Sequence, residues 1–375
     1  MHGTTPVQAR DRPDLPPLPE RLDTPAVVVY VDRVRNNVER LQAILDRRGV
    51  ALRPHAKTHK SVRIARLQLD AGARGLSVGT VGEAETFALA GIHDLFLAYP
   101  IWAEGPKAER IRALHDAIDL AVGVDSAQGA ERLAAAVAGA RRPLRVLVEL
   151  DSGQHRTGVP SPEDAVEVAR AARAAGLVVT GVFTHGGHSY RPGRSAAAAL
   201  DEVATLEAAA AALSAAGFEV ATISAGSTPT MTDAAQGRVN EIRAGTYVLG
   251  DRQQWRLGAI DAAGIATVVA ATVVSAHADR VVLDAGAKAL TKDRADWLEG
   301  HGHLPAYPDA IIERLSDYHG VVRIPPGSPR PARGERVAVV PNHVCPVIDL
   351  VSTFVAVLPD GRVEHWPVDA RGRSG

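Results

Sequence analysis

Residues 53–60 of the 375-residue chain read RPHAKTHK, which places two lysines and two histidines within six positions after a short apolar run. A lysine near a strand end is usually solvated, so the cluster also fits an ordinary loop that leads into a helix. The alternative is chemical: Lys57 supplies a nucleophilic amine for covalent catalysis. His55 and His59 have the i, i+4 spacing of a zinc helix. No glutamate follows the first histidine as in HExxH, so we expect supporting or surface roles for both.

The chain around this cluster alternates short apolar runs with Ala-rich helical stretches. Eight apolar runs are candidate strands: 50–54, 74–79, 94–100, 119–124, 144–151, 178–185, 219–226 and 241–248. Between them lie stretches of helical periodicity such as 126–139, 161–175 and 195–216. Continuous apolar strands suit a parallel sheet that is buried on both faces. Eight such strands that alternate with helices predict the α/β fold class and a (β/α)8 TIM-type barrel.

The pattern changes near residue 258, where β-rich runs joined by Gly, Pro and Asp turns begin. We therefore expect a barrel over 33–257 and a C-terminal β domain over 258–375. The apolar strand at 24–32 precedes the helix that leads into the first barrel strand, and we assign it to the β domain. Residues 1–23 are polar and Pro-rich, and they predict a loose N-terminal arm.

Composition excludes several classes of function. The formal net charge of −1 gives no electrostatic reason to expect nucleic acid or an anionic membrane surface as a partner. No apolar run approaches the roughly 18 residues of a membrane helix, and the N-terminus has no apolar segment typical of a secretory signal. The single cysteine excludes an intrachain disulfide framework, so we expect a protein of the reducing cytoplasm.

In barrels of this type, active sites lie at the C-terminal ends of the strands. Lys57 follows the first strand and Arg156 the fifth, and "THGGHSY" follows the sixth. The seventh and eighth strands end in "SAGSTPT" and "RAGTY", whose small and hydroxyl residues suit a phosphate group, because glycine lets backbone N–H groups approach an anion. An amine opposite a phosphate cradle suggests pyridoxal phosphate, which needs a lysine, a phosphate anchor and a partner for its ring nitrogen.

From about residue 24 onward the chain resembles the fold-type III pyridoxal phosphate enzymes, which combine an alanine-racemase-like barrel with a β domain. Six motifs stand in that family's order: RPHAKTHK, THGGHSY, AGTYVLGD, DAGAK, HGVV and PNHVCP. Within the family the chain is most similar to D-threonine aldolases and eukaryotic-type D-serine dehydratases. The resemblance implies a homodimer, in which each site lies between one subunit's barrel and another's β domain.

The resemblance also implies roles for individual residues. Lys57 matches the Schiff-base lysine, Arg156 the arginine at the phenolic oxygen of the ring, and His185 the histidine packed against the ring. The matching phosphate-binding positions are Gly226, Ser227, Thr228, Gly245 and Thr246.

Arg243 stands where racemases place an arginine beside the ring nitrogen. A guanidinium holds its proton too tightly to protonate that nitrogen, so a fully delocalised carbanion would be disfavoured. The aldolases of the family carry a neutral side chain there. His188 and Tyr190 either line the substrate pocket or shape the loop.

A metal pair is indicated by "PNHVCP". On a strand, the i, i+2 spacing of His343 and Cys345 projects both side chains to one face. An imidazole and a thiolate suit zinc. In the resembled family an HxC pair is typical of zinc-dependent D-serine dehydratases, and an HxD pair of manganese-using D-threonine aldolases. A lone cysteine is otherwise most often a small buried apolar residue.

These observations predict a pyridoxal phosphate- and zinc-dependent lyase for β-hydroxy D-amino acids, most similar to D-serine dehydratase. The alternative is a D-threonine or 3-hydroxy-D-aspartate aldolase that releases glycine and an aldehyde, with Mn²⁺ as the alternative metal. A racemase would need a second, tyrosine base, for which the sequence has no convincing motif. Noncatalytic pyridoxal phosphate-binding proteins of single-barrel type lack a C-terminal β domain.

Overall fold

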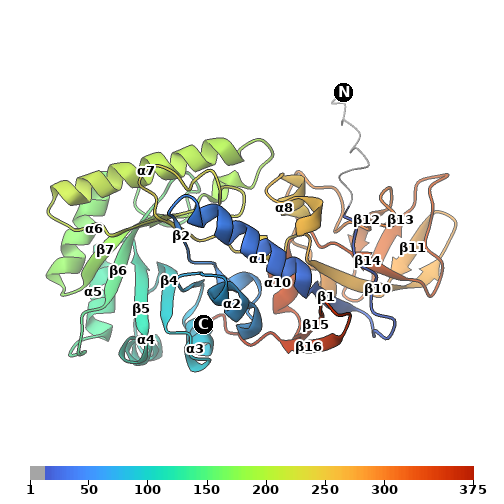
Figure 1. The fold of residues 1–375 in the computed structure, drawn as a ribbon, viewed down its shortest axis with the longest axis horizontal. Helices are drawn as coiled ribbons and strands as arrows, with labels where there is room; N and C mark the ends of the chain where they lie inside the picture. The colour runs from blue at the N-terminus through green and yellow to red at the C-terminus, as the bar shows by residue number, and fades with distance from the viewer. Residues whose placement is uncertain (1–12) are drawn as a thin grey trace. The chain divides into compact units, whose positions relative to one another are not determined.

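The structure is a computed structural model that describes residues 13–375, and the chain divides into two compact units (Figure 1). The barrel unit comprises residues 38–245 and 369–375. The β unit comprises residues 246–368 and the chain up to residue 37. Helix α1 (Val31–Asp46) runs from one unit into the other. The domain limits expected from the sequence stay a prediction.

Eight parallel strands form the sheet of the barrel unit, in the order β2-β9-β8-β7-β6-β5-β4-β3. Their bounds are β2 (Ala51–Leu52), β3 (Leu76–Val78), β4 (Asp94–Pro100), β5 (Asp119–Val124), β6 (Arg145–Leu150), β7 (Val178–Thr184), β8 (Thr222–Ala225) and β9 (Glu241–Ile242). The two ends of this order are joined by backbone bonds, from Arg74 N to Leu52 O (2.8 Å) and from Ser77 N to Pro54 O (2.9 Å). The strands fall within the eight apolar runs, so the predicted α/β barrel is confirmed.

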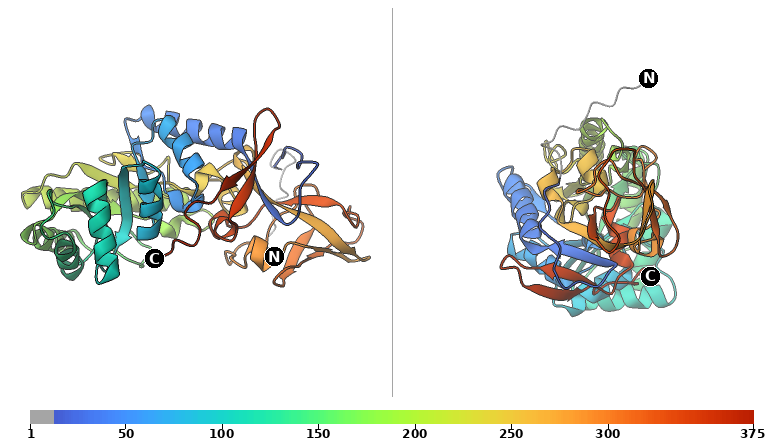
Figure 2. Two further views of the ribbon diagram at one scale, coloured as in Figure 1. Left: turned by 90° about the horizontal axis from the view of Figure 1, so that it is seen from below. Right: turned by 90° about the vertical axis from the view of Figure 1, so that its right-hand side faces the viewer.

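Helices cover the outer face of this sheet (Figures 1 and 2). They are α2 (Val62–Asp70), α3 (Val81–Leu89), α4 (Pro106–Ala117), α5 (Ala127–Ala136), α6 (Pro162–Ala174) and α7 (Ser195–Ala215). Hydroxyl side chains begin three of them: Thr80, Ser126 and Ser161 each accept the backbone N–H of the residue three positions later. Such N-caps satisfy helix donors that have no intrahelical partner.

The inner face carries an aromatic core. Phe96 and Phe183 meet edge to face, with ring centroids 5.0 Å apart, and pack with Ala121 and Leu147. Two short 3₁₀ turns follow barrel strands, η2 (Ala56–Thr58) after β2 and η3 (Gly187–Ser189) after β7.

The β unit is built on a second sheet of eight strands, which is antiparallel except between β1 and β15. The bounds are β1 (Ala26–Tyr30), β10 (Thr267–Ala276), β11 (Arg280–Leu283), β12 (Ile311–Leu315), β13 (Gly320–Arg323), β14 (Arg336–Val339), β15 (Thr353–Val357) and β16 (Val363–Pro367). The N-terminal strand β1 lies between β10 and β15, as predicted.

Short helices interrupt the β unit. They are α8 (Arg252–Arg256), α9 (Ala287–Leu290) and α10 (Val344–Asp349), with 3₁₀ turns η4 (Thr246–Val248) and η5 (Ala262–Gly264). The apolar sequence around Cys345 therefore enters a helix at residue 344, not a strand.

The predicted N-terminal arm lies partly outside the described residues. Residues 13–23 have no helix or strand, but they are attached to the β unit. The hydroxyl of Tyr30 donates to Pro16 O (2.9 Å), and Arg336 donates to Pro19 O (3.0 Å). The loose arm expected for residues 1–23 stays a prediction, although side chains of β1 and β14 donate to carbonyl groups of its described part.

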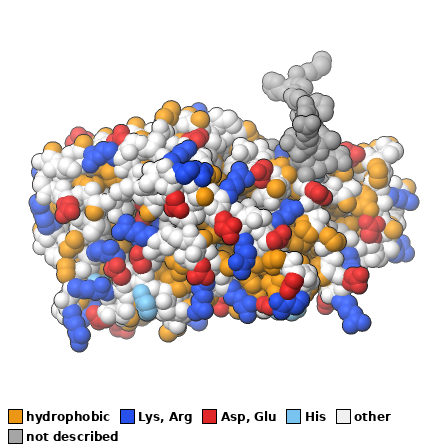
Figure 3. Space-filling model, in the orientation of Figure 1, with side chains coloured by type: hydrophobic (Ala, Val, Ile, Leu, Met, Phe, Trp, Pro, Cys, Tyr) orange, Lys and Arg blue, Asp and Glu red, His pale blue; other side chains and the backbone are white. Residues whose placement is uncertain are grey.

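The surface carries charges of both signs. On the face shown in Figure 3, Lys and Arg side chains are interspersed with Asp and Glu. Within residues 13–375, none of the helices combines the length and the apolar character that a membrane span requires.

Candidate active site

Lys57 lies on the 3₁₀ turn η2, immediately after the first barrel strand, and is exposed. The N-cap of this turn is His55, whose Nδ1 accepts the backbone N–H of Lys57 (3.4 Å). Burial, followed by the charge of Lys57, lowers the pKa of His55 well below its usual value, so this imidazole is neutral. Gly79 lies beside this turn, because a Cβ built on it would make ordinary contacts with His55 Cε1 (3.7 Å) and Lys57 Cβ (4.0 Å).

Lys60, the second lysine of the motif, has a different environment. It is buried, and its Nζ lies 3.5 Å from the Glu83 carboxylate, which also accepts the Gly79 N–H (2.7 Å). His59 is fully buried, where its ring bonds Gln68 (3.2 Å) and accepts the N–H of Ser61 (3.1 Å). The expected surface role is therefore wrong for His59, which supports the turn from the core. The structure leaves Lys57 as the accessible amine of the motif.

His185 follows β7 and is half-buried. Burial lowers its pKa well below the usual value, and the positive charges of Lys57, Arg156 and Arg243 act in the same direction. The barrel unit thus brings three predicted cations around one neutral imidazole. Tyr190 lies nearby, with its ring centroid 6.2 Å from that of His185. His188 turns to Asp201, which its Nε2 contacts at 3.1 Å.

The predicted phosphate loop after β8 is tied to a residue that sequence reasoning missed. Glu202 on α7 is fully buried and accepts the N–H of Gly226 (2.6 Å) and the hydroxyl of Thr230 (2.6 Å). The N–H of Ser227 donates to Thr230 Oγ1 (2.9 Å). Two of the backbone donors expected for an anion therefore already have protein partners. Burial raises the pKa of Glu202 to about 7, although both hydrogen bonds oppose the shift.

The other predicted phosphate loop packs directly against the turn of Lys57. A Cβ on Gly245 would meet Thr58 Oγ1 at 2.8 Å and His55 O at 3.1 Å, so no side chain fits there. The N–H of His55 donates to Ala244 O (3.1 Å). This close approach places the loop after β9 beside the lysine, as a cofactor that spans both would require. Thr246, the next residue, belongs to the β unit.

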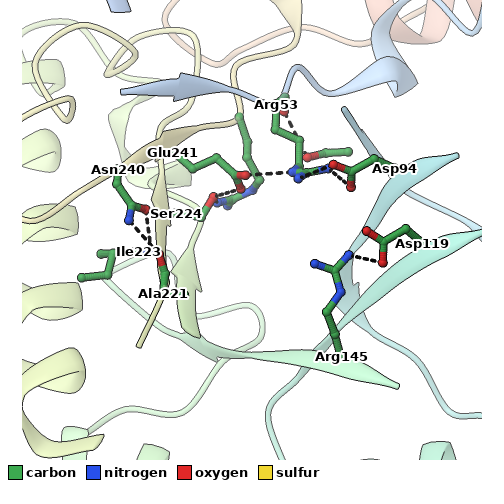
Figure 4. Close-up of polar contacts among 11 residues, drawn as sticks. Arg53, Asp94, Asp119, Arg145, Ala221, Ile223, Ser224, Asn240 and Glu241 are labelled. Carbon is green, nitrogen blue, oxygen red and sulfur yellow. Dashed lines mark hydrogen bonds and ion pairs between the residues drawn. The ribbon is translucent and has the colours of Figure 1, made fainter. Parts of the chain in front are cut away.

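A network of hydrogen-bonded polar side chains fixes Arg243. Figure 4 shows the part of the network that is farthest from Arg243 along the bonds. There Arg53 donates to Asp94 (2.7 Å) and Glu241 (2.8 Å), and Ser224 donates to Glu241 (2.7 Å). Arg243 donates to Ser224 Oγ (2.6 Å). It also donates to Thr184 O and lies 5.1 Å over the ring of Phe183. Burial lowers the pKa of Arg243, and buried carboxylates beginning with Glu241 oppose the shift.

Glu149 on β6 was also missed by sequence reasoning. Its Oε1 accepts the hydroxyl of Thr157 (3.0 Å), whereas its buried Oε2 has no hydrogen-bond partner among the described residues. Burial raises the pKa of Glu149 to about 7, against the hydrogen bond of Thr157 and the charges of Arg156 and Arg243. A single acidic residue inside the apolar run "VLVEL" was the available signal. Arg156 itself is exposed on the following loop.

The predicted metal pair lies on a turn, so its placement on a strand is wrong. Strand β14 ends at Val339, His343 is the N-cap of α10, and Cys345 lies in the first helical turn. Nδ1 of His343 contacts Asp293 Oδ2 at 2.5 Å. Burial lowers the pKa of His343, but the side chains of Cys345 and Asp293 outweigh it and raise the value to about 11.

This arrangement fits a metal. With the Asp293 carboxylate on Nδ1, a metal would bind Nε2 of His343 in place of the proton that the raised pKa keeps there, and the carboxylate would fix the ring, as partners of ligating histidines do. Thr246 Oγ1 lies 3.9 Å from Cys345 Sγ. Within residues 13–375 there is no group of three or more His, Cys, Asp or Glu side chains arranged to hold a metal. The pair could therefore supply two protein ligands, which leaves positions for water or substrate.

Comparisons with known proteins agree with this fold. Residues 29–253 match a family model described as the alanine racemase N-terminal domain, and residues 266–357 match a putative serine dehydratase domain. A D-threo-3-hydroxyaspartate dehydratase of Delftia sp. (strain HT23) is 34% identical, over 92% of this chain and 97% of the relative. A D-threonine aldolase of Arthrobacter sp. is 36% identical, over 94% of each chain.

Solved structures give the same picture. A D-threonine aldolase from Filomicrobium marinum superimposes with a TM-score of 0.85 at 30% identity, covering 94% of this chain and 96% of the other. The Delftia dehydratase gives a TM-score of 0.82 at 33% identity, over 92% and 97% of the two chains. The chain therefore belongs to the fold-type III pyridoxal phosphate enzymes and is a pyridoxal phosphate-dependent lyase of the branch that contains D-threonine aldolases and D-serine dehydratases.

Proposed function

We propose that this lyase dehydrates a β-hydroxy D-amino acid, in the manner of a D-serine dehydratase, with pyridoxal phosphate and zinc. The observation that carries the proposal is the imidazole–thiol pair of His343 and Cys345, in which Asp293 contacts Nδ1 of the imidazole. A thiolate is a softer ligand than a carboxylate and favours zinc over manganese.

Two relatives support dehydration. The similar Delftia protein is named a D-threo-3-hydroxyaspartate dehydratase, and a D-serine dehydratase of Dictyostelium discoideum is 28% identical over 92% of this chain. Structures of a D-threo-3-hydroxyaspartate dehydratase include a histidine-to-alanine variant and a cysteine-to-alanine variant, two positions apart, and the latter is described as metal-free. The HxC spacing of His343 and Cys345 is the same.

In the proposed site, Lys57 would hold the cofactor through its amine, Arg156 would bind the ring oxygen and His185 would pack against the ring. Ser227, Thr228, Gly245 and Thr246, with Gly226 shaping the turn, would hold the phosphate. When bound, pyridoxal phosphate supplies an electron sink for the electrons of the broken Cα–H bond. Arg243 keeps its own proton, because a guanidinium is too weak an acid to give it to the ring nitrogen.

Once the amine of the substrate has displaced it from the cofactor, Lys57 would be the base that takes the α-proton and gives it to the departing hydroxyl, since Lys57 is the exposed lysine of the motif. Neutral His55 and His185 add no positive charge beside it. His343 and Cys345 would hold zinc, whose Lewis acidity would assist departure of the β-hydroxyl as water. The unsaturated product then hydrolyses to an oxo acid and ammonia.

Aldol cleavage is the second candidate, because the Arthrobacter relative is a D-threonine aldolase. Nearly all of the residues above would serve both reactions. We therefore test the proposal with D-serine, D-threonine and 3-hydroxy-D-aspartate, and measure oxo acid, ammonia, glycine and aldehyde separately. Oxo acid and ammonia in equal amounts would support dehydration. Glycine and an aldehyde as the main products would contradict it and show that the enzyme is a D-threonine or 3-hydroxy-D-aspartate aldolase.

We also propose that the enzyme is a homodimer, as the family resemblance implies, and that it resides in the cytoplasm, as the single cysteine suggests. Light scattering of the purified enzyme measures the assembly, and a monomer that keeps full activity would contradict it.

A further inference from the structure

One carboxylate joins two turns of the β unit. Asp251 is fully buried, and its Oδ1 accepts the N–H of Gln254 (2.8 Å), which caps α8. Its Oδ2 accepts the N–H of Val344 (3.1 Å), the residue between His343 and Cys345. Because each carboxylate oxygen is used by a different turn, Asp251 is more than a helix cap.

Further bonds run parallel to this one. The N–H of Arg252 donates to Pro341 O (2.9 Å), the N–H of Gln253 donates to Asn342 O (3.1 Å), and Arg252 Nη1 donates to Asn342 Oδ1 (3.1 Å). Three successive residues at the start of α8, Asp251 to Gln253, therefore each form a hydrogen bond with the turn from Pro341 to Val344. Of these contacts between described residues, the one from Asp251 lies between the two side chains of the metal pair.

The backbone conformation just before Asp251 permits only glycine. Gly250 has φ +65°, and a Cβ there would meet Gly264 O at 2.5 Å, so glycine is required at this bend. Only η4 separates this bend from Gly245, the proposed phosphate loop, and Thr246 in η4 approaches Cys345 Sγ at 3.9 Å. The segment 245–251 thus connects the proposed cofactor loop to the metal turn along one short stretch of chain.

We propose that Asp251 is a positioning residue for the metal pair. By fixing the N–H of Val344, it sets the relative direction of the His343 imidazole and the Cys345 thiol, so that both reach one ion. This role rests on the proposed function, because it requires a metal at the pair. It is separate from the role of Asp293, which orients the imidazole alone.

The variant Asp251→Ser tests the bond to Val344 separately from the bond to Gln254 that caps α8. Serine is a favourable N-cap, so it can keep the bond to Gln254, but its side chain is too short to hold Val344 as well. The matched control is Asp261→Ser, because Asp261 caps η5 in the same unit through the N–H of Gly264 (2.9 Å). Near-ultraviolet circular dichroism and cofactor absorbance establish that each variant is folded and loaded.

The readout is metal binding, not turnover. Purified holoenzyme is stripped of metal and titrated with Zn²⁺ against a chromophoric chelator, and with Co²⁺ to follow the thiolate-to-cobalt absorption band. We expect Asp251→Ser to bind Zn²⁺ about 10–100-fold more weakly, the range typical for lost supporting contacts of a metal site. Its cobalt–thiolate band should be weaker or shifted, while Asp261→Ser matches the wild type.

The outcomes are distinguishable. Wild-type affinity and an unchanged cobalt band in a folded Asp251→Ser variant would overturn the role of Asp251 and leave the proposed function intact. Equal losses in Asp251→Ser and Asp261→Ser would overturn it too, because they would reflect general loosening of the unit. If the wild type binds neither ion, the metal part of the proposed function fails, and the role of Asp251 fails with it.

Discussion

The two units hold their proposed site residues by different means. In the barrel unit the residues follow consecutive strands, and a buried polar chain from Asp94 through Arg53 and Glu241 to Ser224 fixes Arg243 beneath them. In the β unit the metal pair lies on a turn that is held by two carboxylates, Asp251 and Asp293. The sheet itself thus fixes the residues of the barrel site. The metal pair is instead fixed by individual hydrogen bonds from two carboxylates to the turn that carries it.

This difference predicts different sensitivities to mutation. A substitution in the polar network that runs from Asp94 to Arg243 leaves a buried charge without its partner and should lower the stability of the whole barrel unit. A change at the metal turn should alter the metal and the reaction while the fold is kept. The predictions below test this contrast.

The largest effect is expected at the amine. Lys57→Ala removes the proposed attachment point and base, and turnover should fall by more than about 10³-fold, as for other covalent nucleophiles. The purified wild type should be yellow, and borohydride followed by peptide mapping should label Lys57. A label on Lys60, which is buried against Glu83, would contradict the assignment.

The next effect is expected at the metal turn. Cys345→Asp replaces the thiolate with a carboxylate, so zinc affinity should fall and manganese should support more of the remaining activity. We expect less oxo acid and some glycine and aldehyde, measured for each metal on the same enzyme preparation. Unchanged metal preference and products would show that Cys345 is not a ligand. The urea midpoint should stay close to that of the wild type, because the fold does not depend on the pair.

Two ion pairs of the barrel unit, one in the buried polar network and one outside it, offer a matched pair of variants, and Figure 4 shows both pairs. Glu241→Gln removes the charge that faces buried Arg53, and breaking a buried pair typically costs about 3–5 kcal/mol. Asp119→Asn removes the partner of Arg145 in a half-exposed pair (2.6 Å), for which about 0–1 kcal/mol is typical. Urea unfolding measures both. Equal changes in unfolding free energy would contradict the buried chain as a stabilising element.

The smallest effect concerns pH. Glu202 has its pKa raised from 4.5 to about 7 by burial, so between these values the folded state holds a proton that the unfolded state has lost. The stability this proton provides is complete below about pH 4.5 and is lost as pH rises through about 7.

Glu202→Gln should therefore flatten the decline in the free energy of unfolding, measured with urea, between about pH 5 and pH 8, by on the order of 2 kcal/mol. Glu219→Gln, at an exposed carboxylate, is the control. A variant whose pH dependence equals that of the wild type would rule out Glu202 as the titrating group, and Glu149 and Asp251 would then be the carboxyls with comparable shifts among the described residues.

The sequence predicted the barrel well because its strands are continuous apolar runs, and their ends carry the polar residues. It did not predict Glu149 and Glu202, since a carboxylate becomes functional only when the fold buries it. It placed His343 and Cys345 on a strand because the preceding run "RVAVV" is β-rich, whereas Asp251 and α8 turn the chain into a helix at Val344. Asp293 is 50 residues from its partner and carries no local signal.

We propose that zinc on His343 and Cys345 drives loss of the β-hydroxyl. The most direct test compares zinc-loaded and chelated wild-type enzyme with D-serine, D-threonine and 3-hydroxy-D-aspartate, with cofactor absorbance recorded in parallel. We predict oxo acid and ammonia from the zinc enzyme, and no turnover after chelation although the cofactor absorbance persists. Turnover by the chelated enzyme at the rate of the zinc enzyme would contradict the account.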